Sequence, residues 1–171
     1  MDMLDNTAHR INLHYLGEFD WGSLDARTYR ETVTHFMNFG DDKQFWYGNA
    51  PGMPMHTESK NTGGAAKASI RLTGQDLLRI GGEYQRYRLD DRWPASGSGM
   101  MMAPDEFLNI NNGQRDRAAL FAEWESRINP AWMTQLGARY ERVKMDANPV
   151  HGYSALYAMD ANAFNAEDRK K

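Results

Sequence analysis

Methionine and histidine gather in two short segments of this sequence. The first segment is His35-Phe36-Met37, and the second is Met53-Pro54-Met55-His56. Thioether sulfur and imidazole nitrogen are soft or borderline donors, a set that favours Cu(I) and, through histidine, Cu(II). Residues two apart in a strand project to the same side, so His35 and Met37 can approach one ion together. The predicted metal site consists of His35, Met37, Met53, Met55 and His56.

Packing in irregular loops is the alternative explanation for these clusters, because methionine is flexible and fills uneven gaps. The run Met100-Met101-Met102 is a weaker candidate, since adjacent residues cannot all point the same way. We expect His9, His14 and His151 to be incidental.

Catalytic chemistry has little support in the sequence. Glu123 and Glu125 superficially resemble a pair of catalytic carboxylates, but regular charge on the wet face of a strand explains them better. The chain contains no nucleophile motif, phosphate-binding loop or zinc-type cluster. We therefore expect no enzyme activity, no catalytic residues and no required cofactor.

The elements that must position these residues are amphipathic β-strands. Apolar and polar residues alternate with a period of two, as in residues 10–19, 65–72 and 78–85. The pattern predicts three hairpins over about residues 10–39, 65–88 and 117–145. Short turns are expected near residues 20–23, 73–76 and 128–131, where Gly, Asp, Asn and Pro occur.

The connections between the predicted hairpins differ from the short turns. Roughly residues 40–64 and 89–116 are long, polar and rich in Gly and Pro, and the tail after Met145 looks similar. Tight turns at one end and long loops at the other are typical of outer-membrane barrels. Compact soluble domains seldom repeat such long loops. Strands of about 10–12 residues can cross a bilayer at a tilt.

The predicted fold is therefore all-β, an antiparallel up-and-down meander that forms a six-strand segment of a transmembrane β-barrel. A soluble β-sandwich whose second sheet covers the apolar face is the alternative. The barrel prediction requires one convex, lipid-facing side that bears Ile11, Leu13, Ala68, Ile70, Leu78, Ile80, Leu120, Trp124, Leu136 and Tyr140.

Composition excludes several other classes. The chain has 20 basic and 23 acidic residues, a formal charge of −3, and no concentrated basic segment for nucleic acid. It has no cysteine, so disulfides and thiolate metal sites are excluded. Charges interrupt every apolar run before the length of a transmembrane helix. No apolar leader follows Met1, which we expect of an internal or mature segment.

The third predicted hairpin carries a family resemblance. Residues 119–132 (ALFAEWESRINPAW) and 136–141 (LGARYE) resemble a hairpin of TonB-dependent outer-membrane receptors. Residues 78–84 (LRIGGEY) resemble a strand that precedes it, and residues 162–169 the start of a loop. The resemblance implies a barrel of about 22 strands around an amino-terminal plug. Residues 1–171 would then be a partial barrel domain without the plug and the remaining strands.

The same resemblance implies a location and partners. These are the outer membrane of a Gram-negative bacterium, its lipid, the TonB energy-coupling system acting through the plug, and a metal or metal-chelate cargo. His35-Phe36-Met37 resembles the His-x-Met element of the copper-receptor branch, which favours copper. A siderophore or cobalamin receptor of the same family is the nearest alternative. An outer-membrane barrel enzyme is a further one.

Overall fold

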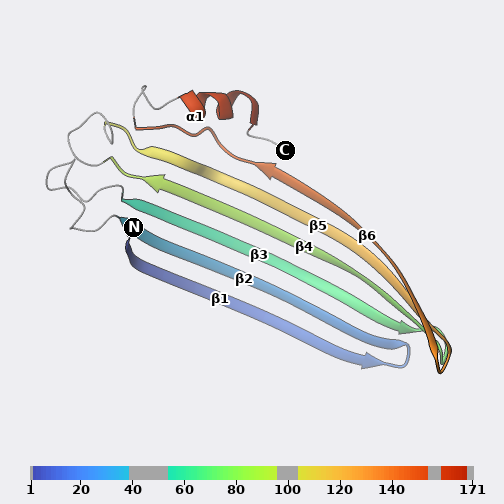
Figure 1. Ribbon diagram of the computed structural model, residues 1–171. Coiled ribbons are helices and arrows are strands. Elements are labelled where there is room, and N and C mark those ends of the chain that lie inside the picture. Colours follow the sequence, from blue (N-terminus) through green and yellow to red (C-terminus); the bar gives the residue numbers. More distant parts are fainter. Residues whose placement is uncertain (1, 39–53, 96–103, 154–158, 169–171) are drawn as a thin grey trace.

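The computed structural model describes residues 2–38, 54–95, 104–153 and 159–168. It contains one six-stranded antiparallel sheet in which strands pair in sequence order (Figure 1). The three tight turns lie at one end of the sheet, which we call the turn end, and the opposite end is the loop end (Figure 1). The predicted meander is confirmed. Its strands are β1 (Asp2–Phe19), β2 (Gly22–Asn38), β3 (Met55–Arg71), β4 (Asp76–Trp93), β5 (Phe107–Asn129) and β6 (Trp132–Asp146).

The two faces of the sheet differ sharply. We call the side that bears Ile11, Leu120 and Tyr140 the outer face, and the opposite side the inner face. Three successive cross-strand rows of the outer face hold no charged residue, and we call them the apolar belt. The belt comprises Phe19, Gly22, Ile70, Leu78, Trp124 and Leu136; Gly17, Leu24, Ala68, Ile80, Ala122 and Ala138; and Tyr15, Ala26, Ala66, Gly82, Leu120 and Tyr140.

Large apolar side chains of the outer face are exposed rather than packed. Ile11 and Tyr140 are each 70% exposed, and Leu120 is 67% exposed. All ten residues predicted to share one side do so, and no second layer of the described chain covers them. Contiguous apolar surface of this kind is abnormal for a soluble monomer and marks an interaction surface. The described residues contain no second sheet of the kind that a β-sandwich requires.

The turns are staggered from β1 to β6. Phe19 is in the last pair before the β1–β2 turn, and Trp124 lies in the same cross-strand row. The last pair before the β5–β6 turn, Asn129 with Trp132, lies five residues further along β5. Five residues at about 3.4 Å, across four strand spacings of about 4.8 Å, give a slope of about 40°. That slope falls in the range of strand tilt in outer-membrane barrels.

On the outer face, the loop-end border of the apolar residues shifts from β1 to β6 in the same direction as the turns. Outward apolar residues continue to Ile11 on β1, and on β6 they stop at Tyr140, two rows nearer the turn end. On β4 the flanking polar residues Asp76 and Arg86 are ten residues apart. At a tilt of about 40° this separation corresponds to about 26 Å along the membrane normal, close to the apolar band of such barrels.

The strands extend further toward the loop end than the sequence analysis predicted. β1 begins at Asp2 rather than near Arg10, and β3 begins at Met55 within the loop expected over residues 40–64. β4 and β5 likewise run into the expected loop 89–116. Beyond the apolar belt most positions of the outer face are polar, so the alternation signal weakens. The backbone groups there still pair across strands, which sustains the sheet.

The chain after β6 packs against the loop end of β5. His151 exchanges backbone hydrogen bonds with Leu108, and the rings of Tyr153 and Phe107 lie 5.3 Å apart between centroids. Helix α1 (Met159–Ala163) continues into η3 (Phe164–Asp168), where only a loop was expected. None of the helices in the described part of the chain is long and apolar enough to cross a membrane.

Aromatic residues mark the turn end. The rings of Phe19 and Trp21 stack at 5.1 Å between centroids, and Trp132 is 70% exposed. Exposed aromatic rings at the edge of an apolar belt are typical of the girdle at a membrane interface.

Candidate functional site

Ion pairs organise the inner face near the turn end. Arg79 on β4 contacts Glu123 at 2.5 Å and Glu125 at 2.8 Å, both on β5. The two glutamates therefore share one arginine and do not form an isolated carboxylate pair. Their arrangement fits charge on a hydrated wall, as the sequence analysis favoured.

A second network of the inner face joins three strands. Glu83 on β4 contacts Arg139 on β6 at 2.9 Å and Arg117 on β5 at 3.4 Å. Glu141 contacts the same two arginines at 3.0 Å and 3.5 Å. All four side chains are partly exposed, so each pair contributes little stability alone. Together they give the inner face a polar, hydrated character.

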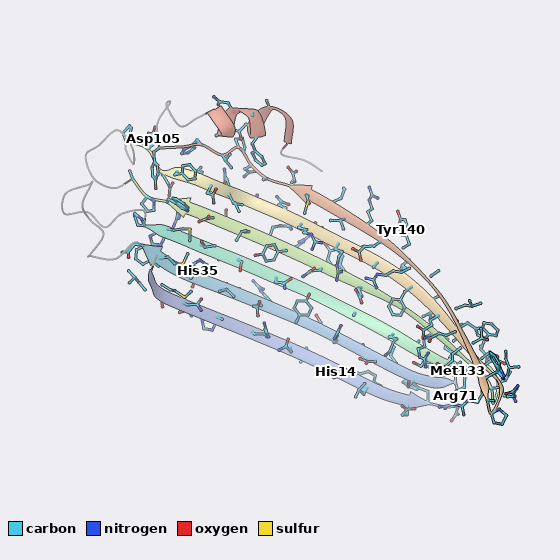
Figure 2. The ribbon with its side chains drawn as sticks, viewed as in Figure 1. His14, His35, Arg71, Asp105, Met133 and Tyr140 are labelled. Carbon is cyan, nitrogen blue, oxygen red and sulfur yellow. The ribbon has the colours of Figure 1, made fainter. Side chains whose placement is uncertain are left out.

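Three of the predicted metal donors meet on the inner face at the loop end. Met37 on β2 lies directly opposite Met55 on β3, and His35 lies two residues from Met37 on the same face. All three are partly buried. His35 lies at the loop end of β2, far from Met133 at the turn end (Figure 2). The predicted approach of His35 and Met37 to one point is therefore compatible with the register.

A fourth potential donor, Met3, was missed by the sequence analysis. Met3 pairs with Met37, so Met3, Met37 and Met55 form one cross-strand row on β1, β2 and β3. The β1 register shifts between Met3 and Asp5, where Leu4 is an extra residue. Strict alternation assigns Met3 to the outer face, and a bulge of this kind cannot be read from the pattern.

The remaining predicted donors lie elsewhere. His56 is in β3 rather than in a loop, and its exposed ring stacks on Phe36 of the outer face at 4.5 Å between centroids. The sheet therefore separates His56 from His35. Met53 and the Met100 triplet lie outside the described residues. Within the described ranges, no three His, Cys, Asp or Glu side chains are grouped closely enough to hold a metal ion.

A buried carboxylate lies next to this row of donors. Asp91 on β4 is 7% exposed and pairs with Thr57, which in turn pairs with His35. Its oxygens accept hydrogen bonds from Thr57 Oγ1 at 3.2 Å and Trp93 Nε1 at 3.1 Å. Asn109 Nδ2 donates a third bond at 2.6 Å. Because three donors engage its oxygens, the Asp91 carboxyl group is held in place rather than available as a ligand.

The other histidines have ordinary roles in the structure. His14 on β1 pairs with Asp25 on β2 at 2.9 Å, and His9 lies on the outer face. His151 joins the tail to β5 through its backbone. None of these belongs to the donor row.

Comparison with known proteins agrees with this architecture. No curated protein and no solved structure is similar enough to the chain to count as a match. One family model, described as TonB dependent receptor-like, beta-barrel, matches residues 1–168. That match covers the whole sheet with its apolar belt and polar inner face. The chain therefore belongs to the family of TonB-dependent receptor-like β-barrels.

Proposed function

We propose that this chain is part of an outer-membrane receptor that takes up a metal or metal chelate, with copper favoured as the cargo, in a Gram-negative bacterium. The family consists of TonB-dependent outer-membrane receptors, which are transporters rather than enzymes. Passage of the cargo and coupling to TonB through a plug domain belong to the same proposal. The family alone does not specify the cargo.

The observation that carries the copper assignment is the row of Met3, Met37 and Met55 beside His35. Thioethers are soft ligands that suit Cu(I), whereas hard cations prefer oxygen donors. The row lies on the inner face at the loop end, where a cargo would enter the lumen. Met3 is 57% exposed and Met37 and Met55 are only partly buried, which supports accessible donors over methionines packed as filler.

The test compares copper binding and uptake in the full-length receptor. We expect His35→Ala and Met37→Leu each to weaken Cu(I) binding by about tenfold or more, because each removes one of few donors. The matched controls are His56→Ala, on the opposite face, and Met133→Leu, at the turn end. Both should leave copper binding unchanged, and uptake of an iron siderophore should be unaffected in all four variants.

Two experimental results would change the assignment of copper as the cargo. Unchanged copper affinity and uptake in both His35→Ala and Met37→Leu would remove these residues from any copper site. Loss of siderophore or cobalamin uptake in the same variants would assign the receptor to the chelate class instead.

A further inference from the structure

The outer face carries six cationic side chains just beyond the loop-end border of the apolar belt. They occupy three successive cross-strand rows on β2, β3, β4 and β6. We call them the cation collar: Arg30, Lys60, Arg86, Arg88, Arg142 and Lys144.

Positive charge is confined to one border of the belt. The row beyond the opposite, turn-end border holds Asp76, Ser126 and Thr134 on the outer face. No described residue of the outer face at that end is cationic, since Arg71 and Arg127 belong to the inner face. A belt with cations along one border and none along the other indicates that the two leaflets differ in charge.

The collar is only partly neutralised by neighbouring carboxylates. Its three rows contain two acidic residues, Asp116 and Asp146, which leaves a surplus of four positive charges. Arg88 is held by Asp116, with nitrogen–oxygen distances of 2.6 Å and 3.3 Å. Lys60 contacts Glu58 of the next row at 2.7 Å.

Arg86 and Lys144 lie on either side of Asp116 in one row. Arg86 Nε is 4.0 Å from Asp116 Oδ1, and the Arg86 side chain is 58% exposed, so it remains accessible to a ligand. Guanidinium groups bind phosphate with two parallel hydrogen bonds, and an ammonium group binds it as a point charge. The register therefore places Arg86 on β4 and Lys144 on β6, on the two sides of β5, which carries Asp116.

We propose that the cation collar binds the phosphate groups of an anionic lipid in the loop-side leaflet. The height of the collar supports this occupant, because it follows immediately after the apolar belt, where lipid headgroups begin. In a Gram-negative outer membrane that leaflet consists of phosphorylated glycolipid, lipopolysaccharide. The collar on the outer face is separate from the donor row on the inner face, so neither proposal depends on the other.

The experiment measures lipopolysaccharide binding by the purified full-length receptor in vesicles of neutral phospholipid. One variant carries Arg86→Gln, Arg142→Gln and Lys144→Gln together, which leaves the Arg88–Asp116 pair intact. The matched control removes three inner-face cations instead, by Arg27→Gln, Lys67→Gln and Arg115→Gln. Each receptor is offered intact lipopolysaccharide and the same lipid after enzymatic removal of its phosphates.

We expect the collar variant to bind intact lipopolysaccharide more weakly by on the order of a hundredfold, about fivefold for each cation removed. The inner-face control should bind like the wild type, and the difference should vanish with dephosphorylated lipid. The single variant Arg86→Gln, at an exposed position, should bind intact lipopolysaccharide about fivefold more weakly. This variant serves as a check in case the triple variant has a folding defect.

Either of two outcomes would overturn the proposal. The first is wild-type affinity in both collar variants. The second is an equal loss in the inner-face control or with dephosphorylated lipid, which would show that phosphate recognition at the collar is not involved.

Discussion

At Gly22, the backbone conformation and the neighbouring strand strongly restrict which residue types can be accommodated. Its φ of 148° lies in a region that residues with side chains rarely adopt. A Cβ built at this position would meet the backbone oxygen of Ser69 at 1.8 Å. Gly22 pairs with Phe19 just after the first turn and lies against β3, so the glycine lets β2 start close to its neighbour.

We expect Gly22→Ala to lower the free energy of unfolding by roughly 1–3 kcal/mol, through backbone strain and displacement of β3. Gly74 is the matched control, because a Cβ there meets nothing within 4 Å. Urea titration of the full-length receptor in lipid vesicles measures both variants. Equal stability of Gly22→Ala and Gly74→Ala would contradict the prediction.

At the residue scale, the sequence predicted part of the candidate site. The spacing of His35 and Met37 was sufficient to assign them to one face, and the register agrees. The structure places Met55 beside Met37 because β3 pairs with β2, and no local sequence pattern reveals that pairing. His56 was grouped with Met55 by proximity in sequence, although adjacent strand residues point to opposite faces.

At the scale of single strands, burial preferences depend on which face a position occupies. Leu120 lies in the middle of the outward part of β5, between Ser126 and Asp116. Gln135 lies on the inner face of β6, close to Glu123 and Glu125. An arginine therefore meets lipid at the first position and carboxylates in water at the second.

We predict that Leu120→Arg lowers the stability of the folded receptor in a bilayer by about 2–4 kcal/mol, the cost of a cation near the midplane. Gln135→Arg should change stability by less than about 1 kcal/mol, since exposed ion pairs contribute little. Unfolding titrations in vesicles measure both. A soluble sandwich would not show this contrast in lipid, and similar values for the two variants would argue against the assigned faces.

The strand pattern was readable from sequence only where one face is apolar. Residues 78–85 alternate clearly, and β4 was predicted there. Near the loop end, pairs such as Lys60 with Arg88 are polar on the outer face, so nothing distinguishes strand from loop. Near the loop end, hydrogen bonding between strands that are distant in sequence determines whether a residue belongs to a strand. The periodicity of the local sequence gives no information about that pairing.

At the scale of the whole sheet, the exposed apolar belt determines that the chain requires lipid or detergent around it rather than water alone. Three uncharged rows on one face, with no covering layer among the described residues, cannot remain dispersed in water. The unpaired outer edges of β1 and β6 in the described sheet add a second route to association.

We expect residues 1–171 produced alone to sediment as aggregates in detergent-free buffer and to disperse with β-structure in micelles or lipid. Analytical ultracentrifugation and far-ultraviolet circular dichroism with and without detergent measure this. A monodisperse, folded monomer in plain buffer would favour the β-sandwich and contradict the assignment of the outer face to lipid.

The stagger of the turns also determines how wide the closed wall must be. Strands inclined by about 40° and spaced by about 4.8 Å give a cylinder of about 22 Å radius when about 22 of them close, the strand number of plugged transporters. No arginine or glutamate can reach across such a diameter. An inner charge that pairs with the wall must therefore find its partner on its own side, as Arg79, Glu83 and Arg139 do with adjacent or next-nearest strands.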